Sequence, residues 1–124
     1  MHTTLTFDPK TPIFRQVAGM IREAILAGDL PEGEAIPSVR QISVEQELNP
    51  QTVLNATRLL LDEVILEKRR GIGVFVKEGA RTALKRRELE IFKNEELPGL
   101  VNRARLLGLS SKETLGLVKD KFKE

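Results

Sequence analysis

The sequence predicts a mainly α-helical protein with one small β-hairpin, fold class α+β, and three stretches carry the prediction. Residues 38–63 show a short capped helix, a tight turn and a longer helix. Two short strands follow at 65–69 and 73–77, joined by a basic turn that contains glycine. Amphipathic helical patterns then run from about residue 82 to the end of the sequence. This order predicts a winged helix-turn-helix followed by a short two-helix C-terminal dimerisation region.

The 124 residues are expected to form two domains, a winged helix-turn-helix DNA-binding domain at 1–78 and a helical dimerisation region at 79–124, and the two differ in net charge. The first domain carries nine Lys or Arg and eleven Asp or Glu, a net charge of −2. The second carries eleven and seven, a net charge of +4. Because the first domain is slightly acidic, any contact it makes with phosphates must depend on local clusters of positive charge.

The residue types present exclude several classes of function. Cysteine is absent, and His2 is the sole histidine, at a terminus that we expect to be mobile. Catalytic residues, a cofactor and a metal are therefore not predicted, because the side chains that usually supply such sites do not cluster. No apolar run approaches the roughly 18 residues of a membrane span, and no signal peptide is evident at residues 1–10, so we expect a cytoplasmic protein.

The first helix is expected at residues 12–27. Thr11 can cap it, Pro12 suits its first position, and Gly28 marks its end. Its apolar residues recur at helical spacing: Ile13, Phe14, Val17, Met20, Ile21, Ala24 and Ile25. This stripe needs a partner, which the helix-turn-helix supplies. A very short strand is allowed at Ala35–Ile36.

Two helix starts follow from local capping signals. Ser38 and Gln41 match a capping box at the start of the second helix. Asn49 and Pro50 predict the N-cap and the first residue of the third helix. One side of the third helix is apolar and should pack on the first two helices, through Val53, Ala56, Thr57, Leu60 and Leu61.

Four polar residues lie largely off that packed side and are candidate DNA contacts: Gln51, Thr52, Asn55 and Arg58. In a helix-turn-helix, the exposed N-terminal half of this helix enters the major groove. Gln and Asn can bond adenine in two places there, and Arg reads guanine or holds phosphate. Polar residues on a helix surface are more often merely solvated, but the neighbouring basic hairpin favours binding.

The hairpin tip carries both charge and conformational freedom. Arg69 and Arg70 place two positive charges at the tip, while Gly71 and Gly73 allow positive φ and a close backbone approach. Such a tip could lie along a phosphate backbone or reach into the minor groove. A basic hairpin tip is a weak signal when it stands alone.

The C-terminal region, residues 82–124, is expected to be helical and to pair with a second copy. Pro98 should kink or restart the helix, and Ser110 with Glu113 forms a second capping box. A segment this short cannot readily enclose a small-molecule pocket of usual size, so its unpaired apolar stripe predicts a homodimer. The basic run at 85–87 is most often a solvated face, although it could touch flanking DNA.

These residues resemble the GntR family of bacterial transcriptional regulators, and within it the short YtrA-like group. Three motifs in order and spacing carry the resemblance: Pro37-Ser38-x-Arg40, Asn49-Pro50-x-Thr52-Val53 and Arg70-Gly71-x-Gly73-x-Phe75-Val76. The resemblance covers nearly the whole chain, and the combination is specific although no single motif is. In that group a short two-helix region mediates dimerisation in place of a larger effector domain.

The resemblance implies roles for individual residues. Arg40 matches an arginine that contacts DNA from the start of the second helix, and Ser38 belongs to the same motif. Arg70 and Gly71 match the wing tip that approaches the minor groove. Recognition-helix positions facing phosphates and bases are matched by Asn49, Gln51, Thr52 and Asn55. Members of the group are commonly repressors acting near their own operons.

Some positions depart from the family pattern. Leu54 stands where many relatives have arginine or serine, which points to different base readout, including contact with thymine methyl groups. Gln46 and Glu47 replace a usual apolar residue and glycine. Val64 replaces a helix-ending glycine, so the third helix is expected to end differently here. Ile72 replaces a frequent lysine and leaves the wing tip less basic.

The leading hypothesis is a homodimeric repressor of transcription that reads a palindromic operator in double-stranded DNA. The alternative is a winged-helix protein-interaction module without direct DNA binding, which the acidic first domain favours. Single-strand binding is disfavoured because all five aromatic residues are phenylalanines, most on apolar stripes. The sequence identifies no small-molecule effector.

Overall fold

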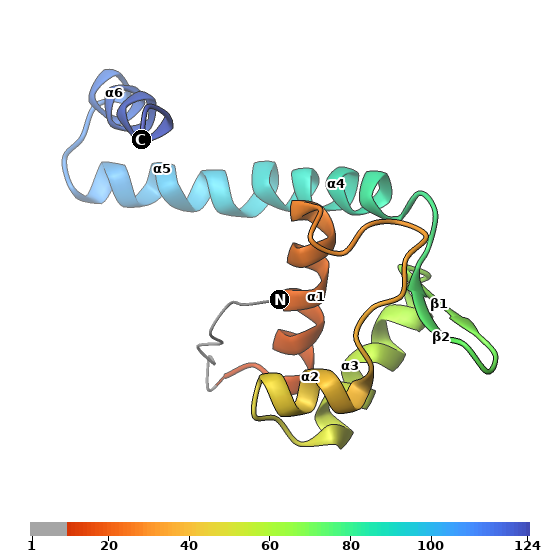
Figure 1. Cartoon of the computed structure of the whole chain (residues 1–124). Coiled ribbons are helices and arrows are strands. Elements are labelled where there is room, and N and C mark those ends of the chain that lie inside the picture. Colours follow the sequence, from red (N-terminus) through yellow and green to blue (C-terminus); the bar gives the residue numbers. More distant parts are fainter. Residues whose placement is uncertain (1–9) are drawn as a thin grey trace. The chain divides into compact units, whose positions relative to one another are not determined.

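A computed structural model describes residues 10–124, so His2 lies outside the described residues (Figure 1). These residues form two compact units, divided between Lys85 and Arg86. The first unit contains α1 (Ile13–Ala27), α2 (Val39–Glu45), α3 (Pro50–Asp62), β1 (Leu66–Arg69), β2 (Gly73–Val76) and the start of α4 (Ala80–Ile91). The second unit contains the rest of α4, η1 (Phe92–Glu96), α5 (Leu97–Leu106) and α6 (Ser111–Phe122). The predicted class, mainly α with a small wing, is confirmed.

Helix α1 begins one residue later than predicted, and Thr11 does not cap it. Pro12 is the N-cap, in an extended conformation, and no side chain caps the helix. The Pro12 carbonyl accepts hydrogen bonds from the N–H groups of Arg15 and Gln16. The end is as predicted: Gly28 has φ 86°, a left-handed conformation that glycine adopts without steric cost.

The starts of α2 and α3 confirm the predicted caps. Ser38 Oγ accepts from the Gln41 N–H, and the Ser38 N–H donates to Gln41 Oε1, which completes the capping box. Asn49 Oδ1 accepts from the Gln51 N–H at 2.8 Å, and Pro50 is the first residue of α3. These bonds satisfy N–H groups that a helix start otherwise leaves without partners.

The end of α3 corrects one expectation. Val64, the position for which the family pattern implies glycine, still adopts the left-handed conformation, with φ 62°. The N–H of Val64 bonds the Leu61 carbonyl and that of Ile65 bonds the Leu60 carbonyl, which closes the helix as glycine would. Glu47, the other departure from glycine, has φ 54°. The surrounding hydrogen bonds and the buried Ile65 hold Val64 in a conformation that β-branched residues disfavour.

The wing is an antiparallel hairpin in which Leu66 pairs with Val76 and Arg69 with Gly73. Residues ahead of α2 add a short third edge, as predicted for Ala35–Ile36. Ala35 forms an isolated bridge with Phe75, and the Ile36 N–H donates to the Val74 carbonyl at 2.9 Å. The segment leading into α2 is thereby fastened to the wing.

One hydrophobic core joins the elements of the first unit. Among its fully buried large side chains are Ile21 and Ile25 of α1, Leu60 of α3, Leu66 of β1 and Leu84 of α4. A bidentate ion pair borders this core: Arg22 of α1 donates to both carboxylate oxygens of Glu63, at 3.0 and 2.7 Å. Both side chains are mostly buried, at 15% and 22% exposure.

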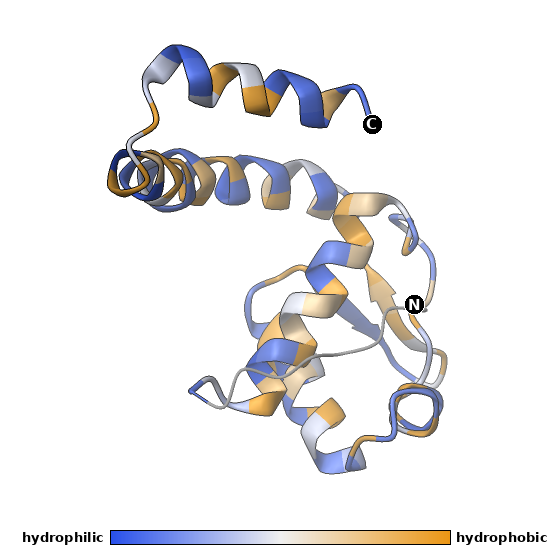
Figure 2. Cartoon of the chain, turned by 90° about the vertical axis from the view of Figure 1, so that its left-hand side faces the viewer, coloured by the Kyte–Doolittle hydropathy of each residue, from blue (hydrophilic) through white to orange (hydrophobic). Residues whose placement is uncertain are grey.

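The second unit is a run of helices with its apolar side chains largely exposed. Pro98 lies in the first turn of α5, and the π-helical turn η1 comes directly before it. The Leu97 N–H bonds the Phe92 carbonyl five residues back, a wider turn that accommodates the proline and confirms the predicted break. Ser110 and Glu113 form the predicted capping box of α6, whose ribbon mixes hydrophilic and hydrophobic residues (Figure 2). Across residues 10–124, no helix is long and apolar enough to cross a membrane.

Candidate nucleic-acid interface

The first group of candidate residues lies at the start of α2. The Ser38 hydroxyl accepts the capping-box hydrogen bond from the Gln41 N–H, so its contribution is to fix the start of α2. Arg40, the second residue of α2, is exposed, and its side chain has no protein partner within the described residues. The capping box therefore holds an unneutralised guanidinium at the helix start, a geometry suited to a phosphate.

The second group lies on the N-terminal half of α3, which packs against α2. Asn49 caps the helix, and the Gln51 side-chain Nε2 donates to Asn55 Oδ1 at 3.0 Å. Gln51 is exposed, while Thr52 and Asn55 are half-buried. Arg58, two turns into the helix, is exposed and has no side-chain partner in residues 10–124.

The third group is the wing tip, where the structure separates the two predicted arginines. Arg69 lies over the Phe75 ring, 4.0 Å from its centroid, and its Nη2 is 3.1 Å from Glu67 Oε1. Arg70 is exposed and, within the described residues, has no such partner. Gly71 follows with φ 75°, which makes the tight turn possible. Arg70 is therefore the arginine free to reach outward.

The structure brings the α2 and α3 groups together, because these two helices pack on each other. The wing tip stands apart from them. No hydrogen bond or ion pair of the described chain links Arg70 or Gly71 to the α2 and α3 candidates. The candidate surface thus consists of two separate patches in the first unit: the helix patch (Ser38, Arg40, Asn49, Gln51, Thr52, Asn55 and Arg58) and the wing tip (Arg69, Arg70 and Gly71).

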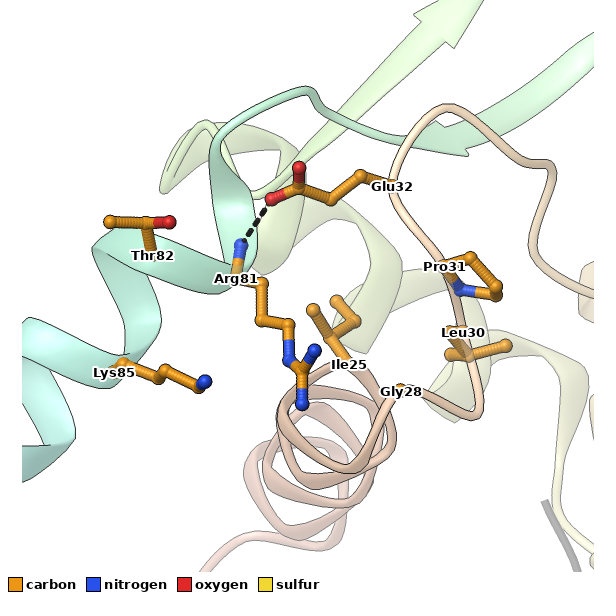
Figure 3. Close-up of a pocket in the computed structure, with 8 residues that line it drawn as sticks. All are labelled: Ile25, Gly28, Leu30, Pro31, Glu32, Arg81, Thr82 and Lys85. Carbon is orange, nitrogen blue, oxygen red and sulfur yellow. Dashed lines mark hydrogen bonds between the residues drawn. The ribbon is translucent and has the colours of Figure 1, made fainter.

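Sequence reasoning missed a junction between the C-terminal end of α1 and the start of α4. Glu32 accepts a hydrogen bond from the Arg81 N–H at 2.8 Å (Figure 3). Arg81 Nε donates to the Leu26 carbonyl at 3.1 Å. Lys85, part of the basic run, lies one turn further along α4. A pocket of about 390 Å³ opens here, lined by Ile25, Gly28, Leu30, Pro31, Glu32, Arg81, Thr82 and Lys85. The spacing of Arg81 and Lys85 was a signal in the sequence, but the partners of Arg81 lie about fifty residues away.

The second unit offers two apolar grooves between α5 and α6, of about 400 and 350 Å³. Leu100 and Val118 line both grooves, Leu117 lines the first, and Leu115 lines the second. Leu115 and Leu117 are 61% and 54% exposed, so neither is covered by the chain itself. An uncovered apolar face of this kind marks a site of association.

Comparisons with known proteins find relatives over most of the chain. Residues 14–76 match the family described as "Bacterial regulatory proteins, gntR family". The HTH-type transcriptional repressor YtrA of Bacillus subtilis is 34% identical over 107 residues, covering 85% of this chain and 82% of that protein. A GntR-family regulator from Bacteroides thetaiotaomicron is 30% identical, with a TM-score of 0.66 over 90% of this chain and 96% of that one. A GntR-family regulator from Listeria monocytogenes is similar in fold, with a TM-score of 0.75 at 23% identity, covering 92% and 98%.

Proposed function

We propose that the chain, which belongs to the gntR family of bacterial regulatory proteins, is a repressor that binds a palindromic operator as a homodimer. Its family shows that it is a DNA-binding transcriptional regulator and not an enzyme. The observation that carries the proposal is the polar N-terminal half of α3 beside the unpaired Arg40, both held in place by side-chain caps. In this arrangement α3 enters the major groove and α2 holds the backbone. The similarity to a named repressor supports the direction of regulation.

Contacts to DNA are divided between the two patches. In the helix patch, Arg40 and Arg58 contact phosphates, while Gln51, Thr52 and Asn55 face the bases and Asn49 holds the helix start. Arg70 and Gly71 reach the minor groove beside the site, and Arg69 supports the wing from its position over Phe75. The first unit carries no net positive charge, so one protomer binds weakly and two protomers are required.

The homodimer forms through residues 82–124, with the α5–α6 grooves of one protomer covered by the other. The apolar lining of both grooves and the exposure of Leu115 and Leu117 support this pairing. A dimer aligns two copies of α3 with half-sites about one helical turn apart, on the order of 10 bp. The protein acts in the cytoplasm, on nucleoid DNA.

Binding selection from random duplexes with the full-length chain tests the proposal. We expect enriched duplexes with two inverted half-sites, bound by one dimer. Affinity for them should fall at least about 100-fold between 50 and 200 mM salt, since four or more phosphates per dimer are neutralised. A folded, dimeric chain that enriches no duplex, or whose DNA binding is insensitive to salt, contradicts the proposal. That result would favour the protein-interaction module instead.

A further inference from the structure

A pair of hydrogen-bonded amides lies on the first two turns of α3. Gln51 Nε2 donates to Asn55 Oδ1 at 3.0 Å, and the Gln51 backbone N–H is itself bonded to Asn49 Oδ1 at 2.8 Å. As an exposed pair one turn apart, it adds only ~0.2–0.5 kcal/mol to the helix. Its larger consequence is that the bond favours one arrangement of the two amides in the free chain.

The pair leaves a specific pattern of groups unused. Gln51 retains its Oε1 acceptor and Asn55 retains its Nδ2 donors, so one acceptor and one kind of donor stay available to a ligand. Exchanging O and N in both amides reverses their order but leaves the same combination. In the major groove, a single base that offers an acceptor beside a donor is adenine, through N7 and N6, whereas guanine offers two acceptors.

The charge of this helix segment supports the same reading. Residues 50–57 contain no Lys, Arg, Asp or Glu, and Arg58 is the first charged residue of α3. Arg and Lys make the commonest contacts to guanine, and Asp and Glu accept from cytosine. The first two turns of α3 therefore lack the side chains that best read G·C pairs.

Leu54 lies on the same side of α3, three residues after Gln51 and next to Asn55. It is half-buried, and it does not belong to the side chains described as packed on the core cluster. An aliphatic side chain here can contact the methyl group of thymine. Along the helix axis it lies within the span of the amide pair, about 1.5 Å before Asn55, but at ~3.6 residues per turn its side chain leaves the helix about 100° away from that of Asn55. This sideways displacement is what directs Leu54 toward a neighbouring base pair.

We propose that Gln51, Leu54 and Asn55 act together as a reader of two successive A·T pairs, with the amide pair bonding adenine N7 and N6 and Leu54 packing on the thymine methyl of the neighbouring pair. This inference rests on the proposed function, because α3 must enter the major groove. It adds the identity of the bases that each half-site presents to α3.

The test begins with the random-duplex selection on the full-length chain. Each half-site should contain two adjacent A·T pairs at fixed positions. The selected duplex is then synthesised with single-atom changes at those pairs. Replacing the adenine by 7-deazaadenine removes N7, and replacing the thymine by uracil removes the methyl group.

We expect the 7-deazaadenine duplex to bind the wild-type chain about tenfold more weakly, the loss of one of two bonds to the base. The uracil duplex should bind about fourfold more weakly, the effect of one buried methyl group. In the orientation that the structure shows, Asn55 Nδ2 is the donor to N7, so Asn55→Ala should be insensitive to 7-deazaadenine. Leu54→Ala should be insensitive to uracil. Because the modified duplexes are also measured with the unaltered chain, the test holds even if a variant fails to fold.

Leu54→Arg gives a second test by gain of specificity. In a repeated selection, the pair facing position 54 should change from A·T to G·C, because Arg bonds guanine O6 and N7. The inference is overturned if the wild-type half-sites carry G·C pairs at the positions that respond to Leu54→Arg. It is also overturned if either modified base weakens wild type and variants equally. Those outcomes leave the proposed function intact when binding stays salt-sensitive and dimeric, whereas a chain that selects no duplex overturns both.

Discussion

The two units of the chain differ in where they put their apolar side chains. Of the seventeen buried apolar residues in the described chain, sixteen lie in the first unit and only Ala104 lies in the second. Of fourteen large apolar residues that are exposed, ten lie in the second unit. The first unit therefore completes its own core, while the second leaves an apolar surface exposed, as is typical of a surface that takes part in association. In the proposed dimer, the incomplete unit supplies the pairing and the complete unit supplies the DNA contacts.

The net positive charge of the chain lies outside the unit that carries the candidate DNA contacts, although DNA is negatively charged. The first unit, residues 1–85, carries eleven Lys or Arg and eleven Asp or Glu, a net charge of zero, whereas residues 86–124 carry nine and seven, a net charge of +2. The first unit compensates by leaving Arg40 and Arg70 unpaired at exposed positions while Arg22 and Arg69 are held by carboxylates. Placement of a few charges, more than their number, distinguishes its candidate interface.

Removing the apolar surface of the second unit should have the largest effect. We expect the double variant Leu115→Gln with Leu117→Gln to be monomeric at micromolar concentration in sedimentation analysis. Its operator affinity should fall by about 100-fold or more, because the second half-site is no longer tethered to the first. The double variant Lys119→Gln with Asp120→Gln is the matched control: it adds two glutamines to α6 outside both grooves and leaves the net charge unchanged. A Leu variant that stays dimeric would place the dimer interface elsewhere.

Breaking the ion pair of the first unit tests whether that unit is stable by its own contacts. Arg22→Met leaves Glu63 mostly buried without its bidentate partner, and should reduce the free energy of unfolding by about 2 kcal/mol. The melting temperature should drop by roughly 10 °C in thermal denaturation followed by circular dichroism. Arg15→Met, at an exposed position of the same helix, should change it little. Equal decreases in melting temperature for Arg22→Met and Arg15→Met would show that this ion pair does not stabilise the first unit.

The unpaired arginines of the first unit should each account for a moderate part of DNA affinity. We expect Arg40→Ala and Arg70→Ala to weaken operator binding about tenfold each. In each variant, the slope of log affinity against log salt concentration should become less steep by about 2 for the dimer, one unit for each protomer. Arg69→Ala should have a smaller effect, since Arg69 is held by Phe75 and Glu67. Lys112→Ala removes the same charge from α6 and serves as the control in fluorescence-anisotropy titrations. Unchanged affinity in both the Arg40 and Arg70 variants would refute the assignment of these residues.

The smallest effect concerns the left-handed Val64 at the end of α3. Val64→Gly should stabilise the protein by about 1 kcal/mol, because glycine adopts φ 62° without the steric cost that valine bears. The same substitution at Val44, exposed inside α2, should instead destabilise it, since glycine is a poor helix former. Melting temperatures that move in opposite directions would confirm the difference. A lower melting temperature for Val64→Gly would show that the valine side chain contributes more than its backbone costs.

Residues that act on near neighbours were predictable. The Ser38 and Ser110 capping boxes, the Asn49 cap and the Gly28 helix end all depend on bonds between groups at most three or four residues apart. The Thr11 prediction was wrong for a related reason, because Pro12 takes the extended N-cap conformation and moves the helix start past Thr11. The prediction that α3 ends differently at Val64 was wrong for another reason. A β-branched residue disfavours the left-handed conformation, but the rest of the fold imposes it there.

The sequence by itself determined the order of the elements, their caps and the polar character of the N-terminal half of α3, because capping and helical periodicity are local. Only the tertiary structure decided which arginines are free, since Glu63 is forty-one residues from Arg22 and the Phe75 ring reaches Arg69 across the hairpin. Likewise, the attachment of Arg81 to Leu26 and Glu32 depends on packing between distant segments. The local sequence pattern predicts which residues can contact DNA, while contacts between distant segments determine which of their charges have no partner in the folded protein.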